Sequence, residues 1–195
     1  MGDIVDTLDA YCKDNDVDVH KTYFWICCLC VNQHRVAQSL QEGSKGLSMP
    51  TEIFLKTFGF RVTTIGHLVC LLSPFKDPLY LKRIWCVYEI SRALATPNCK
   101  VDVVCAPQQI ARMKQYMDQG IPGEIWIMDQ KDRIHDAICK INVKNASASQ
   151  ESDKDEILRW IEAHATGGCE GTNERVRSLF QAKFDTLCEE IFQFE

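Results

Sequence analysis

Residues 66–95 of the 195-residue chain read GHLVCLLSPFKDPLYLKRIWCVYEISRALA, and their pattern changes once, from an unbroken apolar run to a helical repeat. The run His67–Leu72 is short and almost entirely apolar, which is typical of a strand covered on both faces in a parallel sheet. Ser73-Pro74 ends it, and Pro78 suits a first helical turn. Apolar residues then recur at helical spacing at Ile84, Val87, Tyr88, Leu94 and Ala95. These patterns predict a buried strand, a turn and an amphipathic helix.

A second stripe of this helix carries Trp85, Glu89 and Arg92. A spacing of four residues places the Trp85 ring and the Glu89 carboxylate on the same side of a helix. An aromatic ring beside an acid would suit a bound nucleotide. The alternative is a partly buried tryptophan and a glutamate that pairs with Arg92 or Lys82, and the spacing leaves both interpretations open.

The motif at the end of the strand and on the helix resembles that of a known family. Leu72-Ser73-Pro74, followed by the run from Trp85 to Ile90, is similar to the "LS…S-x-WC-x-x-EL" signature of Toll/interleukin-1 receptor (TIR) domains. The resemblance implies an α/β fold, with a flavodoxin-like open parallel sheet and helices on both faces. In the members of that family that cleave NAD⁺, the glutamate of the motif is catalytic, and Glu89 occupies the matching position.

A second resemblance lies at Trp25–Gln33, where WICCLCVNQ is similar to the W-I-D-A-L-C-I-N-Q segment of fungal heterokaryon-incompatibility (HET) domains. The chain departs from that segment at Cys27, where the family has an acid. The apolar run Thr22–Val31 predicts another buried strand. Its carboxyl end carries Asn32, Gln33 and His34, where open α/β sheets bind ligands. A turn whose side-chain amides satisfy the backbone is the alternative.

The rest of the chain alternates predicted helices and strands, as α/β proteins do. The predicted helices are 3–14, 51–58 and 108–119, and the predicted strands are 101–105 and 124–128. We expect the runs 23–31, 67–72 and 101–105 to be neighbouring parallel strands. Residues 1–130 would form the α/β domain, and residues 131–195 a helical extension packed on the sheet. TIR domains begin with a further strand that has no counterpart before Ile4, so we expect that strand to be missing.

Composition narrows the classes of partner and compartment. A net charge of −5 and a pI near 5.6 argue against a nucleic-acid partner. The eleven cysteines are odd in number, and the sequence has neither a secretory signal nor an apolar segment of membrane-spanning length. We therefore expect reduced thiols in a cytoplasmic protein. Cys27, Cys28 and Cys30 lack paired metal-ligand spacing, so we expect no metal site.

Two functions follow from the resemblance. The first is NAD⁺ glycohydrolysis in stress or defence signalling, with NAD⁺ as substrate and no cofactor. Glu89 would stabilise the oxocarbenium-like transition state, and nicotinamide would leave as a neutral molecule without a general acid. The expected nucleotide contacts are stacking by Trp85 or Tyr80, phosphate binding by Arg83, a ribose hydrogen bond from Ser73, and contacts from Asn32, Gln33 and His34.

The second function is assembly with its own kind or with another TIR-like partner, in which Glu89 is only structural. The conjunction of Trp85, Glu89 and Asn32-Gln33 at adjacent strand ends favours catalysis, whereas the missing strand and Cys27 count against it. Fold alone does not decide between the two. A thiol enzyme based on Cys86 is the weaker third hypothesis, because a cysteine among apolar helix residues stays protonated.

Overall fold

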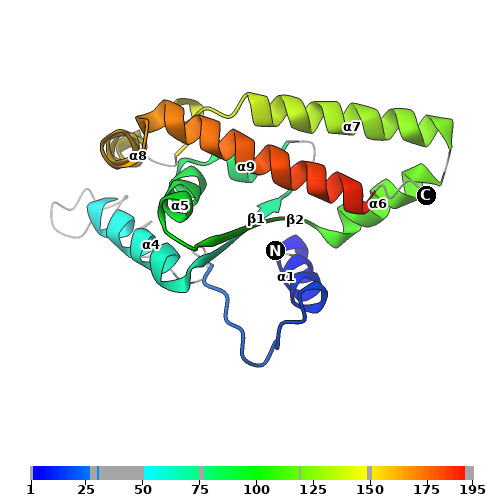
Figure 1. The fold of residues 1–195 in the computed structure, drawn as a ribbon, viewed down its shortest axis with the longest axis horizontal. Helices are drawn as coiled ribbons and strands as arrows, with labels where there is room; N and C mark the ends of the chain where they lie inside the picture. Colours follow the sequence, from blue (N-terminus) through cyan, green and yellow to red (C-terminus); the bar gives the residue numbers. More distant parts are fainter. Residues whose placement is uncertain are drawn as a thin grey trace, which may run out of the picture.

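The computed structural model of the chain describes residues 2–26, 30, 51–74, 77–118, 120–148 and 151–191. Within these ranges helices predominate around a small parallel sheet (Figure 1). In chain order the elements are α1 (Gly2–Asp14), α4 (Thr51–Ile65), β1 (His67–Leu72), η1 (Leu79–Lys82), α5 (Ile84–Ala95), β2 (Lys100–Cys105), α6 (Pro107–Met117), α7 (Ile121–Cys139), η2 (Val143–Asn145), α8 (Glu151–His164) and α9 (Gly168–Ile191).

The two strands β1 and β2 pair in parallel, with His67 opposite Lys100 and Leu72 opposite Cys105. Helix α5 makes the connection between them, as predicted for a βαβ unit. Because side chains alternate along a strand, one face of the sheet points toward α5 and α9 and the other toward α1 (Figure 1). At the coarser level the described residues form a helix-rich structure with a small two-stranded parallel sheet, and the flavodoxin-like order stays a prediction.

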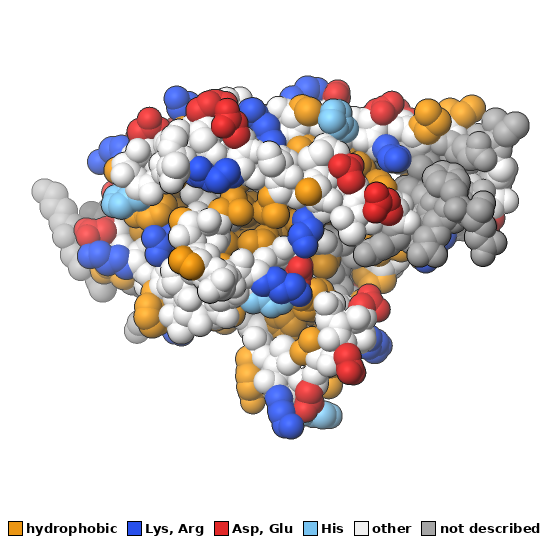
Figure 2. Space-filling model, in the orientation of Figure 1, with side chains coloured by type: hydrophobic (Ala, Val, Ile, Leu, Met, Phe, Trp, Pro, Cys, Tyr) orange, Lys and Arg blue, Asp and Glu red, His pale blue; other side chains and the backbone are white. Residues whose placement is uncertain are grey.

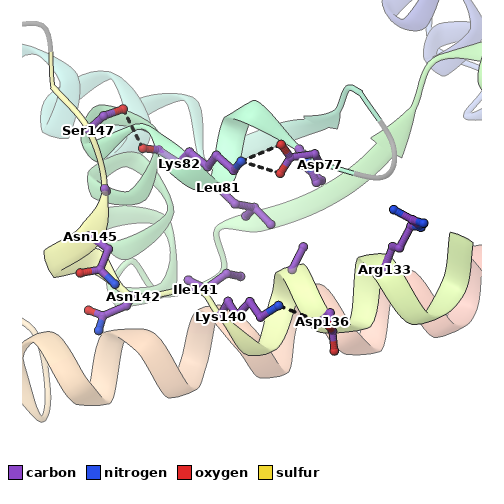
Figure 3. Close-up of a pocket in the computed structure, with 13 residues that line it drawn as sticks. Asp77, Leu81, Lys82, Arg133, Asp136, Lys140, Ile141, Asn142, Asn145 and Ser147 are labelled. Atoms are coloured by element: carbon purple, nitrogen blue, oxygen red, sulfur yellow. Dashed lines mark hydrogen bonds and ion pairs between the residues drawn. The ribbon is translucent and has the colours of Figure 1, made fainter.

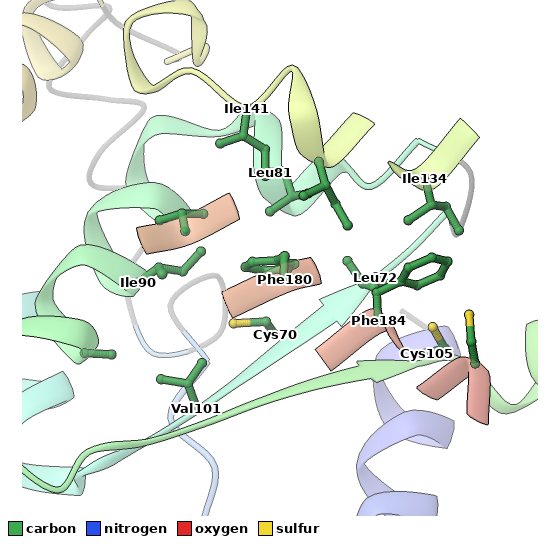
Figure 4. Packing of buried hydrophobic residues seen from close by; sticks show 14 of the residues in the cluster. Cys70, Leu72, Leu81, Ile90, Val101, Cys105, Ile134, Ile141, Phe180 and Phe184 are labelled. Atoms are coloured by element: carbon green, nitrogen blue, oxygen red, sulfur yellow. The ribbon is translucent and has the colours of Figure 1, made fainter. Parts of the chain in front are cut away.

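The main hydrophobic core lies on the α5 and α9 side of the sheet (Figure 4). Cys70 and Leu72 from β1 meet Phe180 and Phe184, and α9 carries these two rings across the strands. Ile134 of α7 packs into the same cluster. Each fully buried side chain of this size contributes roughly 1.5–3 kcal/mol through the apolar surface it removes from water. The C-terminal helices therefore complete the core that covers the sheet.

The predicted division between residues 130 and 131 falls inside the continuous helix α7. The core cluster joins side chains from both sides of that point, including Cys70 from β1 and Phe180 from α9. Side chains of α7 and α9 are buried in the same cluster as the strands, whereas Ile157 and Ile161 of α8 are buried in a second cluster.

A second cluster lies where α4, α5 and α8 meet. Tyr88 is its central ring, and its hydroxyl donates a 2.7 Å hydrogen bond to the carbonyl of Leu55. Gly59 allows this approach, because a Cβ atom at that position would lie 2.9 Å from the Tyr88 hydroxyl. The cluster fixes α5 from the side opposite to the sheet, and it thereby sets the rotation of the helix that carries Glu89.

Two predicted strands are wrong where the structure describes them. Residues 22–26 form no strand, and the backbone of Cys30 donates to the carbonyl of Ile26 as in a helix, while 27–29 and 31 lie outside the described residues. Residues 124–128 belong to α7, and Ile125 and Met128 are exposed there. A short apolar run does not separate strand from helix by itself, and Pro122 in the first turn favours the helix.

Candidate functional site

A cavity of about 650 Å³ is lined by β1 and by elements that pack on both faces of the sheet. Its walls come from α1, residues 22–26, the end of α4, β1 and the first turns of α5. In Figure 2, apolar side chains reach the surface where the lobe containing α1 meets the body of the molecule. Four of the predicted site residues line the cavity: Ser73, Tyr80, Arg83 and Glu89. Pairing of β1 with β2 and packing of α5 bring these four together.

Glu89 is the half-buried acid of this cavity. Burial raises its pKa to about 7, even though the nearby Arg83 charge and the Tyr80 hydroxyl act to lower it. Glu89 therefore changes charge near neutral pH, and a positively charged ligand in the cavity would favour its ionised form. A strongly perturbed acid in a concave site is a typical feature of functional sites.

The Tyr80 hydroxyl lies near Glu89, Cys70 and Cys86. Burial is the main reason that its pKa is raised well above 10, so the group stays a neutral hydroxyl. The oxygen is shielded from solvent and interacts with the Glu89 carboxylate and the Cys70 thiol, in a geometry too poor for a regular hydrogen bond. A bound ligand could form a better hydrogen bond with this buried hydroxyl, so its position at the cavity wall indicates a role in binding.

The other two residues frame the carboxyl end of β1. Ser73 follows the strand directly, and its hydroxyl donates a 3.0 Å hydrogen bond to the Asp3 carboxylate of α1. Arg83 is exposed at the N-cap position of α5. The carboxyl end of a parallel strand beside a helix N-terminus is the usual ligand position in open α/β sheets.

Trp85 does not line this cavity. Its ring packs against Phe58 at 5.0 Å between centroids, and its indole nitrogen donates a 3.3 Å hydrogen bond to Asp153 of α8. The structure therefore does not bring Trp85 into this cavity beside Glu89, and ligand stacking by Trp85 stays a prediction. The helix α5 is covered on more than one side, so residues four positions apart contact different neighbours. The predicted contacts Asn32, Gln33 and His34 lie outside the described residues.

The opposite end of β1 carries a charged cluster that the sequence did not reveal. One oxygen of Asp102 lies 2.6 Å from the Tyr11 hydroxyl, 2.9 Å from His67 Nε2 and 2.7 Å from Lys100 Nζ. Burial alone would raise the pKa of Asp102, but these bonds outweigh it and hold the pKa well below its usual range. His67, Lys100 and Tyr11 also line the cavity. Only the strand register and the packing of α1 bring these residues together.

A second hollow of about 620 Å³ lies between η1, α7 and the segment after it (Figure 3). Its charged side chains form exposed pairs: Asp77 with Lys82 at 2.6 Å, and Asp136 with Lys140 at 3.3 Å. Exposed pairs of this kind stabilise a fold by only about 0–1 kcal/mol. None of the predicted site residues lines this hollow. The cavity of Glu89 is therefore the better candidate site.

Within the described residues, no group of three or more His, Cys, Asp or Glu side chains could hold a metal ion. No disulfide joins the nine cysteines that the structure describes. None of the described helices combines the length and the apolar character needed to cross a bilayer. Comparison of the chain with models of protein families, with curated proteins and with solved structures found no match.

Proposed function

We propose that the chain is a TIR-like domain with a flavodoxin-like open parallel sheet. It cleaves NAD⁺ at the bond between nicotinamide and ribose and acts in stress or defence signalling. The observation that carries the proposal is Glu89, a half-buried carboxylate with a pKa of about 7 at the wall of a cavity beside the carboxyl end of β1. The similarity of residues 72–90 to the TIR motif supports the same assignment.

The dimensions of the cavity fit an extended nucleotide. Its volume of about 650 Å³ is within the usual range for small-molecule sites. His67 and Ser73, at the two ends of β1, both line it. A strand rises about 3.3 Å per residue, so these positions lie roughly 20 Å apart along the strand. A ligand that contacts both ends must be elongated, as a dinucleotide is.

The charge of Glu89 suits cleavage of a cationic substrate. The pyridinium ring of NAD⁺ is positive, so its arrival beside Glu89 favours the ionised carboxylate and expels a proton from the acid. As the bond to ribose breaks, positive charge moves onto the sugar, and the carboxylate stabilises it. The electrons of the broken bond neutralise the pyridinium, so nicotinamide leaves without protonation. Water then attacks the sugar and releases one proton to the solvent.

Other cavity residues would hold the substrate in place. The Tyr80 hydroxyl forms no hydrogen bond of regular geometry with the described residues and could donate one to a ribose oxygen. Arg83 is near enough to act on the charge of Glu89, and its guanidinium suits a phosphate. Ser73 would have to exchange its bond with Asp3 for a bond to the sugar.

The alternative is a non-catalytic module that assembles with its own kind or with another TIR-like domain. One observation favours it: large apolar side chains at the cavity wall are exposed, with Tyr23 at 88%, Leu79 at 57% and Ile65 at 49%. A partner could cover them. Under this hypothesis Glu89 has no chemical role.

Incubation of concentrated protein with NAD⁺, with nicotinamide release followed by chromatography, separates the two functions. We expect Glu89→Gln to lower turnover by about two orders of magnitude or more, because it removes the charge and keeps the size. The matched control is Glu52→Gln, on an exposed acid of α4 that pairs with Lys56. Equal release from the wild type and both variants would exclude the catalytic role of Glu89, and no release at any protein concentration would exclude the glycohydrolase.

A further inference from the structure

A second group of reactive side chains lies away from both hollows, where α7 and α9 run side by side (Figure 1). The Cys139 sulfur is 3.5 Å from His135 Nε2, and His135 Nδ1 is 2.9 Å from the Gln181 amide oxygen. The Gln181 amide nitrogen donates a 2.8 Å hydrogen bond to Asp185. These four residues form one continuous chain of hydrogen bonds across two helices.

Asp185, at the end of this series of hydrogen bonds, determines which atom donates in each bond. A carboxylate only accepts, so Asp185 must face the NH₂ of Gln181, which turns the Gln181 oxygen toward His135. That oxygen also only accepts, so Nδ1 of His135 carries a proton. In the neutral ring Nε2 is then the acceptor, and the Cys139 thiol donates to it. The arrangement is a nucleophile, a base and a group that orients the base.

The helices hold this geometry in place through the core beside it. Ile134 and Ile138 precede His135 and Cys139 on α7, and both are almost completely buried. On α9, Phe180 and Phe184 precede Gln181 and Asp185 and are buried in the same cluster. The backbone positions of the four polar residues are therefore fixed by packed neighbours, while Cys139 and His135 themselves are exposed.

We propose that Cys139 is a site of reversible thiol–disulfide exchange, activated by His135 and oriented by Gln181. The co-reactant is a low-molecular-weight disulfide. His135 Nε2 accepts the thiol proton, and the Cys139 sulfur attacks one sulfur of the disulfide. The old S–S bond breaks as the new one forms, and the departing thiolate takes the proton from His135. A mixed disulfide at Cys139 results, and a thiol reductant reverses it.

The test uses the full-length protein with glutathione disulfide at pH 7, and follows the mixed disulfide on each cysteine by peptide mapping over time. His135→Phe keeps a flat ring and removes the base, and we expect it to slow modification of Cys139 about tenfold, because no neighbouring group then accepts the thiol proton. Gln181→Met keeps the length of the side chain but frees the imidazole of His135 to rotate. Its rate of modification at Cys139 should lie between those of the wild type and His135→Phe.

His164→Phe is the matched control, because His164 is an exposed histidine of α8 that stacks on Trp160. It should leave the rate at Cys139 unchanged, and the exposed Cys30 provides an internal reference in every sample. A His135→Phe protein that melts like the wild type and still modifies Cys139 at the same rate overturns the proposal. A wild-type rate in Gln181→Met would overturn the role assigned to the amide.

Discussion

Replacing Glu89 with glutamine should stabilise the protein at alkaline pH, although it removes the residue proposed to act on NAD⁺. Burial raises the pKa of this acid from 4.5 to about 7, so the folded protein holds a proton that the unfolded chain releases earlier as pH rises. Each tenfold difference in proton affinity corresponds to about 1.4 kcal/mol. Ionised Glu89 therefore costs the fold roughly 3 kcal/mol above pH 7.

The sign follows from the order of the two pKa values. Below about pH 4.5 the acid is protonated in both states and contributes nothing to the pH dependence. Between 4.5 and 7 the folded state binds more protons, so stability falls as pH rises. Glutamine does not titrate, so the free energy of unfolding of Glu89→Gln, relative to that of the wild type, should increase by about 2–3 kcal/mol between pH 5 and pH 8.

Urea unfolding at both pH values, followed by the fluorescence of the four tryptophans, measures this difference. Asp102→Asn is a control of opposite sign, because hydrogen bonds hold the pKa of Asp102 below its ordinary 3.8. That variant should lose stability at neutral pH, and the loss should shrink as pH falls below about 4. A Glu89→Gln advantage that is the same at pH 5 and pH 8, or a loss at pH 8, would refute the reasoning.

Three further predictions concern the cavity and the core. The kcat/KM for NAD⁺ cleavage should rise with pH to a plateau, with a midpoint near the Glu89 pKa of about 7. The midpoint of the kcat profile should lie at lower pH, because bound pyridinium favours the ionised carboxylate. A kcat/KM that falls across this range would contradict the role of Glu89. Tyr80→Phe removes a buried hydroxyl whose contacts with Glu89 and Cys70 have poor geometry, so it should change stability in urea little while weakening NAD⁺ binding in a calorimetric titration. Unchanged affinity would remove Tyr80 from the site. Phe184→Ala should lower the free energy of unfolding by about 3–5 kcal/mol, because α9 completes the core on the sheet. Calorimetry should show a single unfolding transition, and two separate transitions would indicate an independent C-terminal domain.

Local pattern in the sequence predicted the elements whose burial follows a simple repeat. β1 and β2 are apolar runs, and α5 and α6 carry helical spacing, so both the type and the approximate bounds of these elements agree with the structure. Residues 22–26 and 124–128 were assigned wrongly, because a short apolar run has the same composition in a strand, a helix or a cavity wall.

Glu89, Ser73, Tyr80 and Arg83 line one cavity because they lie in a continuous stretch near one strand end, and their role in binding stays a prediction. Trp85 shows the limit of that reasoning. Its four-residue spacing from Glu89 indicated a shared surface, but α4 and α8 cover the tryptophan, and no local pattern in residues 66–95 encodes where those helices pack.

Contacts between distant residues were decided by the tertiary structure alone. Tyr11 meets Asp102 across 91 positions, and His135 meets Gln181 across 46. The hydrophobic periodicity of the sequence does not indicate which partner a polar residue of this kind will contact. That partner depends on the register of a strand, or on which side of a helix is buried by neighbouring side chains. Periodicity records which side of an element is buried, whereas only packing determines which element lies against it.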